Sequence, residues 1–256
     1  MPLHQVLGHA WERHDGSRMT RPSGRRLDEL RTLTIEPDFL EQASGSALIS
    51  FGKTRVLCTA SLEDGVPRWL YGNGRGWLTA EYSMLPASTG QRTQREASTG
   101  RQKGRTVEIQ RLIGRALRAV ADMEVLGERT LWLDCDVLQA VGGTRCAAIS
   151  GAYVAARRAL DHVGLGRVLS DSVAAVSVGI VDGEALLDLD YTEDSSAEVD
   201  VNVVLAGDGR LIEVQATAER APLSRDQLED LLDLAVGGIE EIGIAQREAV
   251  EAVRAT

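Results

Sequence analysis

The feature that most constrains the fold of this sequence is a strand-like segment that ends at two glycines and passes directly into a helix-like segment. Between Thr130 and Gln139, residue character alternates with the two-residue period of a strand. Gly142 and Gly143 then indicate a turn, and the small residues of 144–160 predict a helix. The chain therefore places a helix N-terminus where a strand ends.

Further strand-like and helix-like segments occur in blocks along the chain. A hairpin is expected at 46–61 around the turn Gly52-Lys53, and an amphipathic helix is expected at about 107–120. A last helix begins at Ser224, which has the capping-box spacing to Gln227. Other strands are expected at 77–83, 172–181, 185–190, 198–205 and 211–217. Because these blocks do not form strict βαβ units, the sequence favours a single layered α+β domain.

Length and composition limit the class of protein. A chain of 256 residues with 43% hydrophobic residues fits one large globular domain. Residues 1–18 have no hydrophobic period and precede Met19, so we expect a disordered extension there and a folded domain at 19–256. No stretch resembles a membrane span or a secretory signal. Cys58, Cys135 and Cys146 lie in apolar stretches without CxxC spacing, which indicates buried thiols and a cytoplasmic location.

Positive charge is concentrated in one segment of an otherwise acidic protein. The formal net charge is -10, yet eight basic residues stand against two acidic ones between Arg92 and Arg118. Residues 87–104 carry almost no large apolar side chain, so we expect a long functional loop there. The basic segment is either a focused anion site or the solvated face of a helix, and its composition leaves both interpretations open.

The glycine turn has the chemistry of an anion site. N–H groups at a helix N-terminus point outward, the helix dipole favours negative charge there, and glycine lets the backbone approach closely. Thr144 could add a hydroxyl donor and Arg145 a planar set of donors suited to phosphate. The turn is neither a P-loop nor a dinucleotide-binding turn. It is also compatible with an ordinary helix start, so the residues alone leave both possibilities open.

An acidic segment near residue 194 provides the second candidate site. It holds six carboxylates in thirteen residues: Asp188, Asp190, Glu193, Asp194, Glu198 and Asp200. Uncompensated carboxylates repel one another, and a divalent cation such as Mg²⁺ is a common remedy. An exposed acidic turn is the alternative. We expect Asp194 in a turn from which it could reach Asp200 on the following strand. An anion site, a basic segment and an acidic cluster together point to phosphoryl transfer.

Five long motifs in one order resemble the bacterial ribonuclease PH family. They are Gly24–Arg31, Gly76–Pro86, Gly104–Arg115, Asp134–Ala140 and Glu193–Asp200. The resemblance runs from about Arg21 to Arg247, and it implies the α+β fold of the ribosomal protein S5 domain 2-like type. It also implies a phosphorolytic 3′-to-5′ exoribonuclease, or tRNA nucleotidyltransferase. Such an enzyme trims tRNA precursors with inorganic phosphate as co-substrate and releases nucleoside 5′-diphosphates.

The resemblance also assigns residues. It implies that Arg105, Gly143, Thr144 and Arg145 bind the phosphate and that Asp194 and Asp200 bind Mg²⁺. Of these, Arg105, Thr144, Arg145, Asp194 and Asp200 form the expected catalytic set. Arg92 and Arg95 match arginines that guide RNA and contribute to subunit contacts. The family assembles as a homohexameric ring, a trimer of dimers, and no membrane partner is implied.

The sequence departs from the family pattern in the segment 214–224 and just before the glycine turn. Ala216 and Ala218 replace glycines, and they would be strained if the backbone required positive φ there. Arg220 replaces an acidic or small residue, Pro222-Leu223 replaces Thr-Phe, and Val141 replaces an aspartate. The proposed phosphate and metal residues are intact, so an active variant enzyme is the main interpretation.

Two alternatives belong to other classes. A catalytically weakened RNA-binding ring subunit would typically lack Arg105, Arg145 or an acidic ligand, all of which are present. A small-molecule kinase of related fold would need a longer phosphate loop than Gly142–Arg145.

Overall fold

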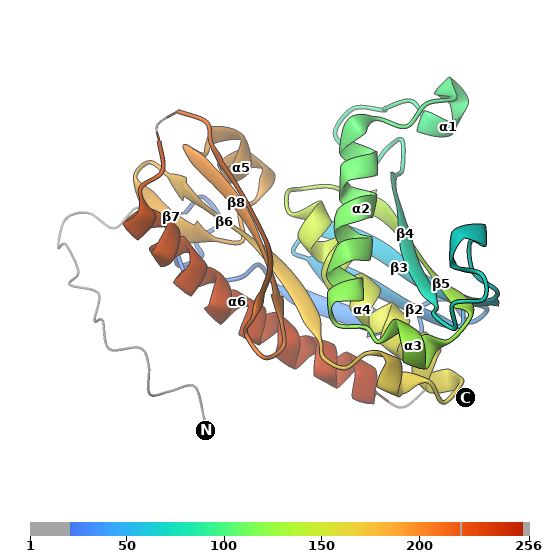
Figure 1. Ribbon diagram of the computed structural model, residues 1–256. Helices are drawn as coiled ribbons and strands as arrows, with labels where there is room; N and C mark the ends of the chain where they lie inside the picture. Colours follow the sequence, from blue (N-terminus) through green and yellow to red (C-terminus); the bar gives the residue numbers. More distant parts are fainter. Residues whose placement is uncertain (1–20, 221, 253–256) are drawn as a thin grey trace.

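The computed structural model describes residues 21–220 and 222–252. It consists of two β-sheets with helices packed against them (Figure 1). The first sheet has five strands in the order β1-β2-β3-β5-β4, and the second has four in the order β7-β6-β8-β9. The expected extension at 1–18 lies outside the described residues. Within the described part of the chain, no helix combines the length and apolar composition that crossing a bilayer requires.

The first sheet is built from the N-terminal half of the chain. Its strands are β1 (Leu33–Pro37), β2 (Gly45–Phe51), β3 (Thr54–Asp64), β4 (Trp77–Met84) and β5 (Arg129–Gln139). The expected hairpin is β2–β3, with its turn at Gly52-Lys53. All neighbouring strands pair antiparallel except β4 and β5, which pair parallel because the chain crosses over between them.

The second sheet is antiparallel throughout and is followed by a long helix. Its strands are β6 (Val173–Val181), β7 (Glu184–Leu187), β8 (Val199–Ala206) and β9 (Leu211–Ala218), all paired antiparallel. Helix α6 (Arg225–Glu251) follows and packs on β6, β7 and β1. Ser224 and Gln227 form the capping box that the sequence predicts.

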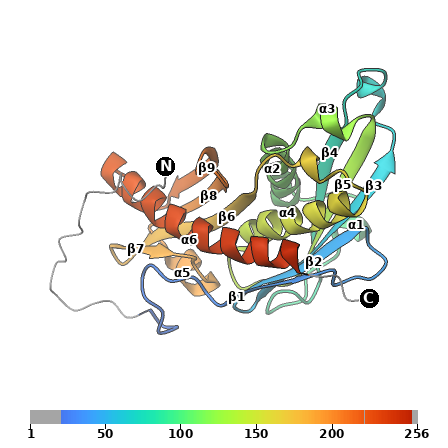
Figure 2. The same cartoon turned by 90° about the horizontal axis from the view of Figure 1, so that it is seen from below.

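The helices α2 (Gly104–Ala119) and α4 (Thr144–His162) cover one face of the first sheet, and α4 also contacts β6 and α6 (Figure 2). The small residues of α4 allow this close approach. A Cβ added to Gly151 would lie 2.7 Å from Ile49 and 2.8 Å from the Cys58 thiol. The largest apolar cluster of the described residues accordingly includes side chains of both sheets. All three cysteines are buried and free, as expected.

Several short elements are absent from the sequence prediction. They are β1, α1 (Glu96–Thr99), α3 (Met123–Leu126), α5 (Tyr191–Ser196) and the 3₁₀ turns η2 (Arg68–Leu70) and η3 (Gly166–Val168). None exceeds six residues, so none repeats its pattern often enough to be recognised. The acidic segment was expected to form a turn, and this was wrong, because Asp190 caps α5 with a capping box. Strand β7 ends before Asp188, where φ reaches +53°, instead of continuing to 190.

Candidate active site

The turn at residues 141–145 has the geometry that the sequence predicts for an anion site. Gly143 is the N-cap of α4 with φ 68° and ψ 21°, and Gly142 also has positive φ, at 85°. A larger residue than glycine would also clash at position 142, because an added Cβ would lie 2.7 Å from the Tyr191 backbone nitrogen. Within residues 21–220 and 222–252, the Gly143 N–H has no hydrogen-bond partner. The N-terminus of α4 is thus brought close to the start of α5.

The turn is fixed from behind by buried groups. Arg31 binds the Asp188 carboxylate through Nη2 to Oδ1 at 2.6 Å and through Nε to Oδ2 at 2.9 Å. The same guanidinium donates from Nη1 to the Val141 carbonyl at 2.8 Å. The Thr54 hydroxyl donates to the Gly142 carbonyl at 2.7 Å and accepts from the Val141 N–H at 3.0 Å. These contacts join β3, the segment before β1 and the residue that follows β7 to one turn.

Two side chains at the start of α4 are also held in place. The Tyr82 hydroxyl on β4 donates to Thr144 Oγ1 at 2.9 Å, and both residues are buried. Arg145 Nη1 donates to Gln215 Oε1 on β9 at 2.7 Å and lies 3.6 Å from Glu108 Oε1 on α2. Gln215 in turn donates to Glu108 at 2.9 Å. The predicted phosphate residues Thr144 and Arg145 therefore stand between β4, α2 and β9.

The other predicted basic residues lie on the α1–α2 side of the turn. Arg105 is exposed in the first turn of α2. It lines a pocket with Arg95, Lys103 and Tyr82. Arg92 and Arg95 are exposed in the segment before α1, where the sequence predicts a long loop. The basic segment is therefore partly loop and partly the outward side of α2.

Two of the six clustered carboxylates are paired with arginines in the interior. Asp188 pairs with Arg31, and Glu193 accepts two hydrogen bonds of 2.7 Å from Arg21. Arg25 also lies 3.3 Å from Glu193. The expectation of an uncompensated acidic cluster was therefore wrong for these two, because arginines distant in sequence neutralise them.

Two further carboxylates have local structural roles. Asp190 accepts from the N–H groups of Thr192 and Glu193 as the cap of α5. Glu198 accepts from the Gly183 N–H at 3.0 Å. Asp194 and Asp200 remain, which are the two residues that the family resemblance assigns to the metal.

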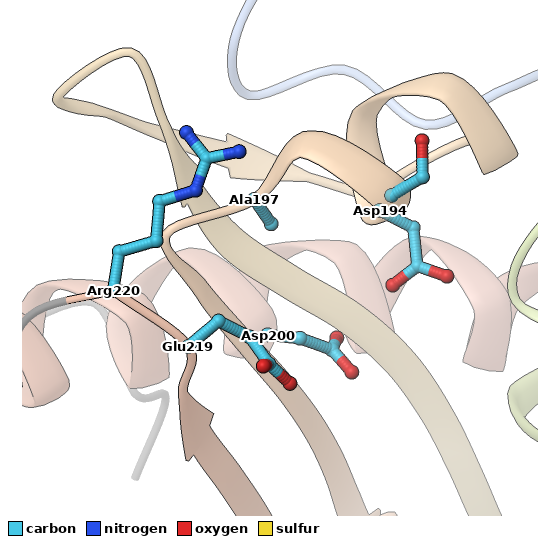
Figure 3. Close-up of a pocket in the computed structure, with 6 residues that line it drawn as sticks. Asp194, Ala197, Asp200, Glu219 and Arg220 are labelled. Atoms are coloured by element: carbon cyan, nitrogen blue, oxygen red, sulfur yellow. The ribbon is translucent and has the colours of Figure 1, made fainter.

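Asp194 on α5 and Asp200 on β8 line one pocket together with Ser195, Ala197, Glu219 and Arg220. Figure 3 shows their carboxylates directed into the same space, whereas the guanidinium of Arg220 points away from Asp200. Burial, and secondarily the charge of Asp194, raises the pKa of the Asp200 carboxyl to about 6. A cation in this pocket would offset both the cost of burying the Asp200 charge and the repulsion from Asp194.

Side-chain contacts and charges connect the carboxylate pocket to the glycine turn at residues 141–145. The charges of Arg145 and Arg105 lower the pKa of Asp200, opposing the effects of burial and Asp194. Asn202 donates to Asp200 Oδ2 at 3.5 Å and accepts from the Cys146 thiol on α4 at 3.3 Å. Side chains from α2, α4, α5 and β8 thus act on the same small region.

The pair of aspartates suits Mg²⁺. No group of three or more His, Cys, Asp or Glu in the described segments is placed to hold a metal ion by itself. Mg²⁺ does not require one, because it usually binds one or two carboxylates and completes its octahedron with water and substrate phosphate oxygens. The donor set of Asp194 and Asp200 therefore fits Mg²⁺ bound together with a phosphate-containing substrate.

The two alanines of the altered segment are not strained. Ala216 and Ala218 lie in β9, paired with Val201 and Val199 of β8. Neither has positive φ, which is found in the described non-glycine residues only at Asp38, Asp182 and Asp188. Replacing glycine by alanine there continues a regular strand. Ala221, between Arg220 and Pro222, lies outside the described residues.

Family models cover most of the chain. Residues 29–159 match domain 1 of the 3′ exoribonuclease family, and residues 171–238 match domain 2. The chain belongs to the 3′ exoribonuclease family. Ribonuclease PH of Moorella thermoacetica is 57% identical over 237 residues, which cover 91% of this chain and 95% of that relative. The resemblance inferred from the motifs is thereby confirmed, and with it the class of enzyme, a phosphorolytic 3′ exoribonuclease.

Solved structures share the fold of this exoribonuclease. Rice (Oryza sativa) Rrp46 superposes with a TM-score of 0.73 at 18% identity, covering 90% of this chain and all of that one. The Archaeoglobus fulgidus exosome with RNA bound to the active site contains a chain that matches at TM-score 0.73 and 22% identity, covering 88% of this chain and 91% of that one. The predicted α+β fold class is confirmed.

Sequence reasoning missed the residues that hold the candidate site together. They are Arg31, Thr54, Tyr82, Glu108, Asn202 and Gln215. Arg31, Tyr82 and Glu108 lie inside the motifs that carry the family resemblance, which was the available signal. Thr54 follows an ordinary hairpin turn, so its part in the site arises only from the packing of β3 against residues 141–142.

Proposed function

We propose that this chain removes nucleotides from the 3′ ends of tRNA precursors by phosphorolysis in the cytoplasm, releasing nucleoside 5′-diphosphates. The observation that carries the proposal is the joining of an anion-binding helix N-terminus to a pocket with two aspartates. Both act within one electrostatic site, since Arg145 and Arg105 influence Asp200. Such a site suits a reaction between two phosphates.

The attacking phosphate binds at the turn. The Gly143 N–H, the Thr144 hydroxyl and the Arg145 guanidinium present donors at the N-terminus of α4, and Arg105 adds charge from α2. These groups offset the repulsion between the free phosphate and the scissile phosphodiester. They also hold the two reactants together, which lowers the entropic part of the barrier.

Phosphorolysis needs no nucleophile from the protein. An oxygen of inorganic phosphate attacks the phosphorus of the terminal phosphodiester, and the 3′-oxygen of the preceding nucleotide leaves with the shortened RNA. Asp194 and Asp200 would hold Mg²⁺, which when bound neutralises charge on the phosphate oxygens and the leaving oxygen. Arg92 and Arg95 are exposed on the loop beside the site, where they would attract the RNA strand.

The direct test is incubation with a 3′-tailed RNA and Mg²⁺, with and without inorganic phosphate, followed by chromatography of the products. Nucleoside diphosphates that appear only with phosphate are expected. Monophosphates would indicate hydrolysis and contradict the proposal. RNA binding without any product would favour the catalytically weakened ring subunit.

The metal proposal has a test that does not depend on turnover. Asp200→Asn should weaken Mg²⁺ binding in calorimetry and abolish metal-dependent product release, while the size-exclusion volume stays unchanged. Asp208→Asn, on the exposed β8–β9 turn, is the control and should bind Mg²⁺ like the parent protein. Unchanged Mg²⁺ binding by Asp200→Asn would remove Asp200 from the metal site.

We also propose that six copies assemble into a ring, a trimer of dimers. The proposal is supported by membership of the ribonuclease PH family and by the shared fold with a chain of the exosome structure. Size-exclusion chromatography with light scattering should give six times the mass of one chain. A monomeric mass at micromolar concentration would contradict it.

A further inference from the structure

Two buried hydroxyl groups stand behind the anion-binding turn. Thr54 is 0% exposed, and Tyr82 is 3% exposed at the edge of the pocket that Arg105 lines; the hydroxyl of each is directed to the turn and not to solvent. Each nevertheless makes a short hydrogen bond to a group of the turn: Thr54 to the Gly142 carbonyl and Tyr82 to Thr144 Oγ1. Their effect on an anion must therefore be indirect, through the groups that they orient.

Thr54 sets the direction of a peptide group. In a trans peptide the carbonyl and the following N–H point in opposite directions. The Gly142 carbonyl accepts from Thr54 at 2.7 Å, and from Arg31 Nη1 and Nη2 at the longer distance of 3.4 Å, so the N–H of Gly143 is turned away from Thr54. Thr54 also accepts from the Val141 N–H at 3.0 Å, which fixes the preceding peptide. Both glycines of the turn have positive φ and would otherwise sample many conformations.

Tyr82 sets the direction of a hydroxyl hydrogen. A hydroxyl has one hydrogen to donate and two lone pairs to accept. Because Thr144 accepts from Tyr82 at 2.9 Å, its own hydrogen is available to an acceptor outside the turn. A tyrosine hydroxyl keeps its proton at neutral pH, and burial raises the pKa of Tyr82 further. The result is a one-way chain from Tyr82 through Thr144 to a bound anion, in which each bond polarises the next.

We propose that Thr54 and Tyr82 are positioning residues of the phosphate site, Thr54 through the Gly142–Gly143 peptide and Tyr82 through the Thr144 hydroxyl. The inference rests on the proposed function, in which this turn holds the attacking phosphate. Neither residue touches the phosphate or the RNA. Both should therefore affect the use of phosphate without affecting the affinity for RNA.

The Tyr82 arm is tested by a double-mutant cycle. Tyr82→Phe removes only the hydroxyl and should raise KM for phosphate about threefold to tenfold, the range of one hydrogen bond. In a Thr144→Val background the same change should have no further effect, since the group through which Tyr82 acts is gone. Tyr153→Phe, on the buried side of α4, is the control and should leave KM unchanged. Equal effects of Tyr82→Phe in both backgrounds would overturn this arm.

The Thr54 arm is tested by a matched set of variants. Thr54→Val keeps the shape and loses the hydroxyl, and should raise KM for phosphate about threefold to tenfold. Thr54→Ser keeps the hydroxyl and should remain within about twofold of the parent, well below the effect of one lost hydrogen bond. Thr54→Cys, a weak donor, should fall between them and replaces the valine variant if that does not fold. An equal KM for serine and valine, or for serine and cysteine, would overturn this arm.

Failure of the inference can be separated from failure of the proposed function. Hydrogen exchange of residues 140–147 should be faster in Thr54→Val than in Thr54→Ser whether or not the enzyme is phosphorolytic. Thr130→Val, which loses a hydroxyl bond to the Gly65 carbonyl far from the turn, should leave that exchange unchanged. If the parent protein releases no diphosphates, the proposed function fails. If exchange at the turn is unaltered by Thr54→Val, the positioning role fails independently.

Discussion

The glycine turn at residues 141–145 and the basic loop before α2 both carry arginines that we propose act on phosphate groups, but the two sets of arginines are held differently. Arg145 is 17% exposed and is fixed by Gln215 and Glu108. The turn beneath it is anchored by a buried Arg31–Asp188 pair. Arg92 and Arg95, by contrast, extend into solvent.

This difference separates two uses of the same side chain. Donors fixed before the substrate arrives lose little energy to reorganisation, and they suit the stabilisation of charge during reaction. Exposed arginines act over longer distances, attract a polyanion and are screened by salt. Mutations in the two regions should therefore differ in size and in the quantity that they change.

The largest effect is expected where the buried support of the turn is broken. Asp188→Asn keeps a residue type that tolerates the positive φ of 53° but removes the charge that pairs with Arg31. Loss of one partner of a buried pair should lower the free energy of unfolding by about 3–5 kcal/mol. Urea unfolding measures the change.

The matched control is an exposed ion pair. Asp161→Asn breaks a contact with Arg157, in which the aspartate side chain is 40% exposed, and should change the free energy of unfolding by about 0.5 kcal/mol or less. Similar losses for both variants would show that the turn is not specially supported by its buried pair.

The next largest effect concerns catalysis at the turn. Arg145→Ala should lower kcat/KM for phosphate by about 100-fold, the usual cost of removing one fixed donor of a reacting oxyanion, while RNA affinity barely changes. Arg115→Ala on α2, whose side chain is 49% exposed, is the control and should retain activity. An equal loss of RNA affinity in Arg145→Ala would instead assign Arg145 to the path of the RNA.

Smaller effects are expected in the basic loop. Arg95→Ala and Arg92→Ala should each weaken RNA binding at low salt and reduce the slope of log Kd against log salt by about 0.7, the value for one contact with single-stranded nucleic acid. KM for phosphate should not change. Filter binding at several salt concentrations gives the slope, and size exclusion reports whether either arginine also supports assembly. If either variant raised KM for phosphate, the loop arginines would act on phosphate as the turn residues do, and the two regions would not differ in function.

The last prediction concerns the pH dependence of stability at Asp200, a half-buried carboxylate between the two regions. Its pKa of about 6 exceeds the usual value of about 3.9 for aspartate, so the folded protein retains a proton that the unfolded chain has lost. The resulting stabilisation is complete below about pH 4 and disappears as pH rises through 6. Without metal, the parent should therefore lose stability relative to Asp200→Asn between pH 4 and pH 7. A constant difference in unfolding free energy across that range would contradict the raised pKa.

The sequence predicted the larger elements because their patterns repeat over enough residues to be recognised. Strand β5, the turn at Gly142 and Gly143 and helix α4 all lie where expected. Short elements such as α5 carry less than two helical turns of pattern and were missed. The role of the acidic segment was only partly foreseen, because Arg21 and Arg31, more than 150 residues away in sequence, neutralise Glu193 and Asp188.

The sequence by itself determined the family and the α+β class, since these depend on local pattern and on motifs that occur in a fixed order. It also predicted which residues form the candidate phosphate site. Only the tertiary structure decided which groups orient them. Thr54, Tyr82 and Gln215 gain their roles from contacts between elements far apart in the chain. A hydrogen bond requires atoms to meet within about 3 Å at a suitable angle, and no spacing along a sequence specifies that meeting.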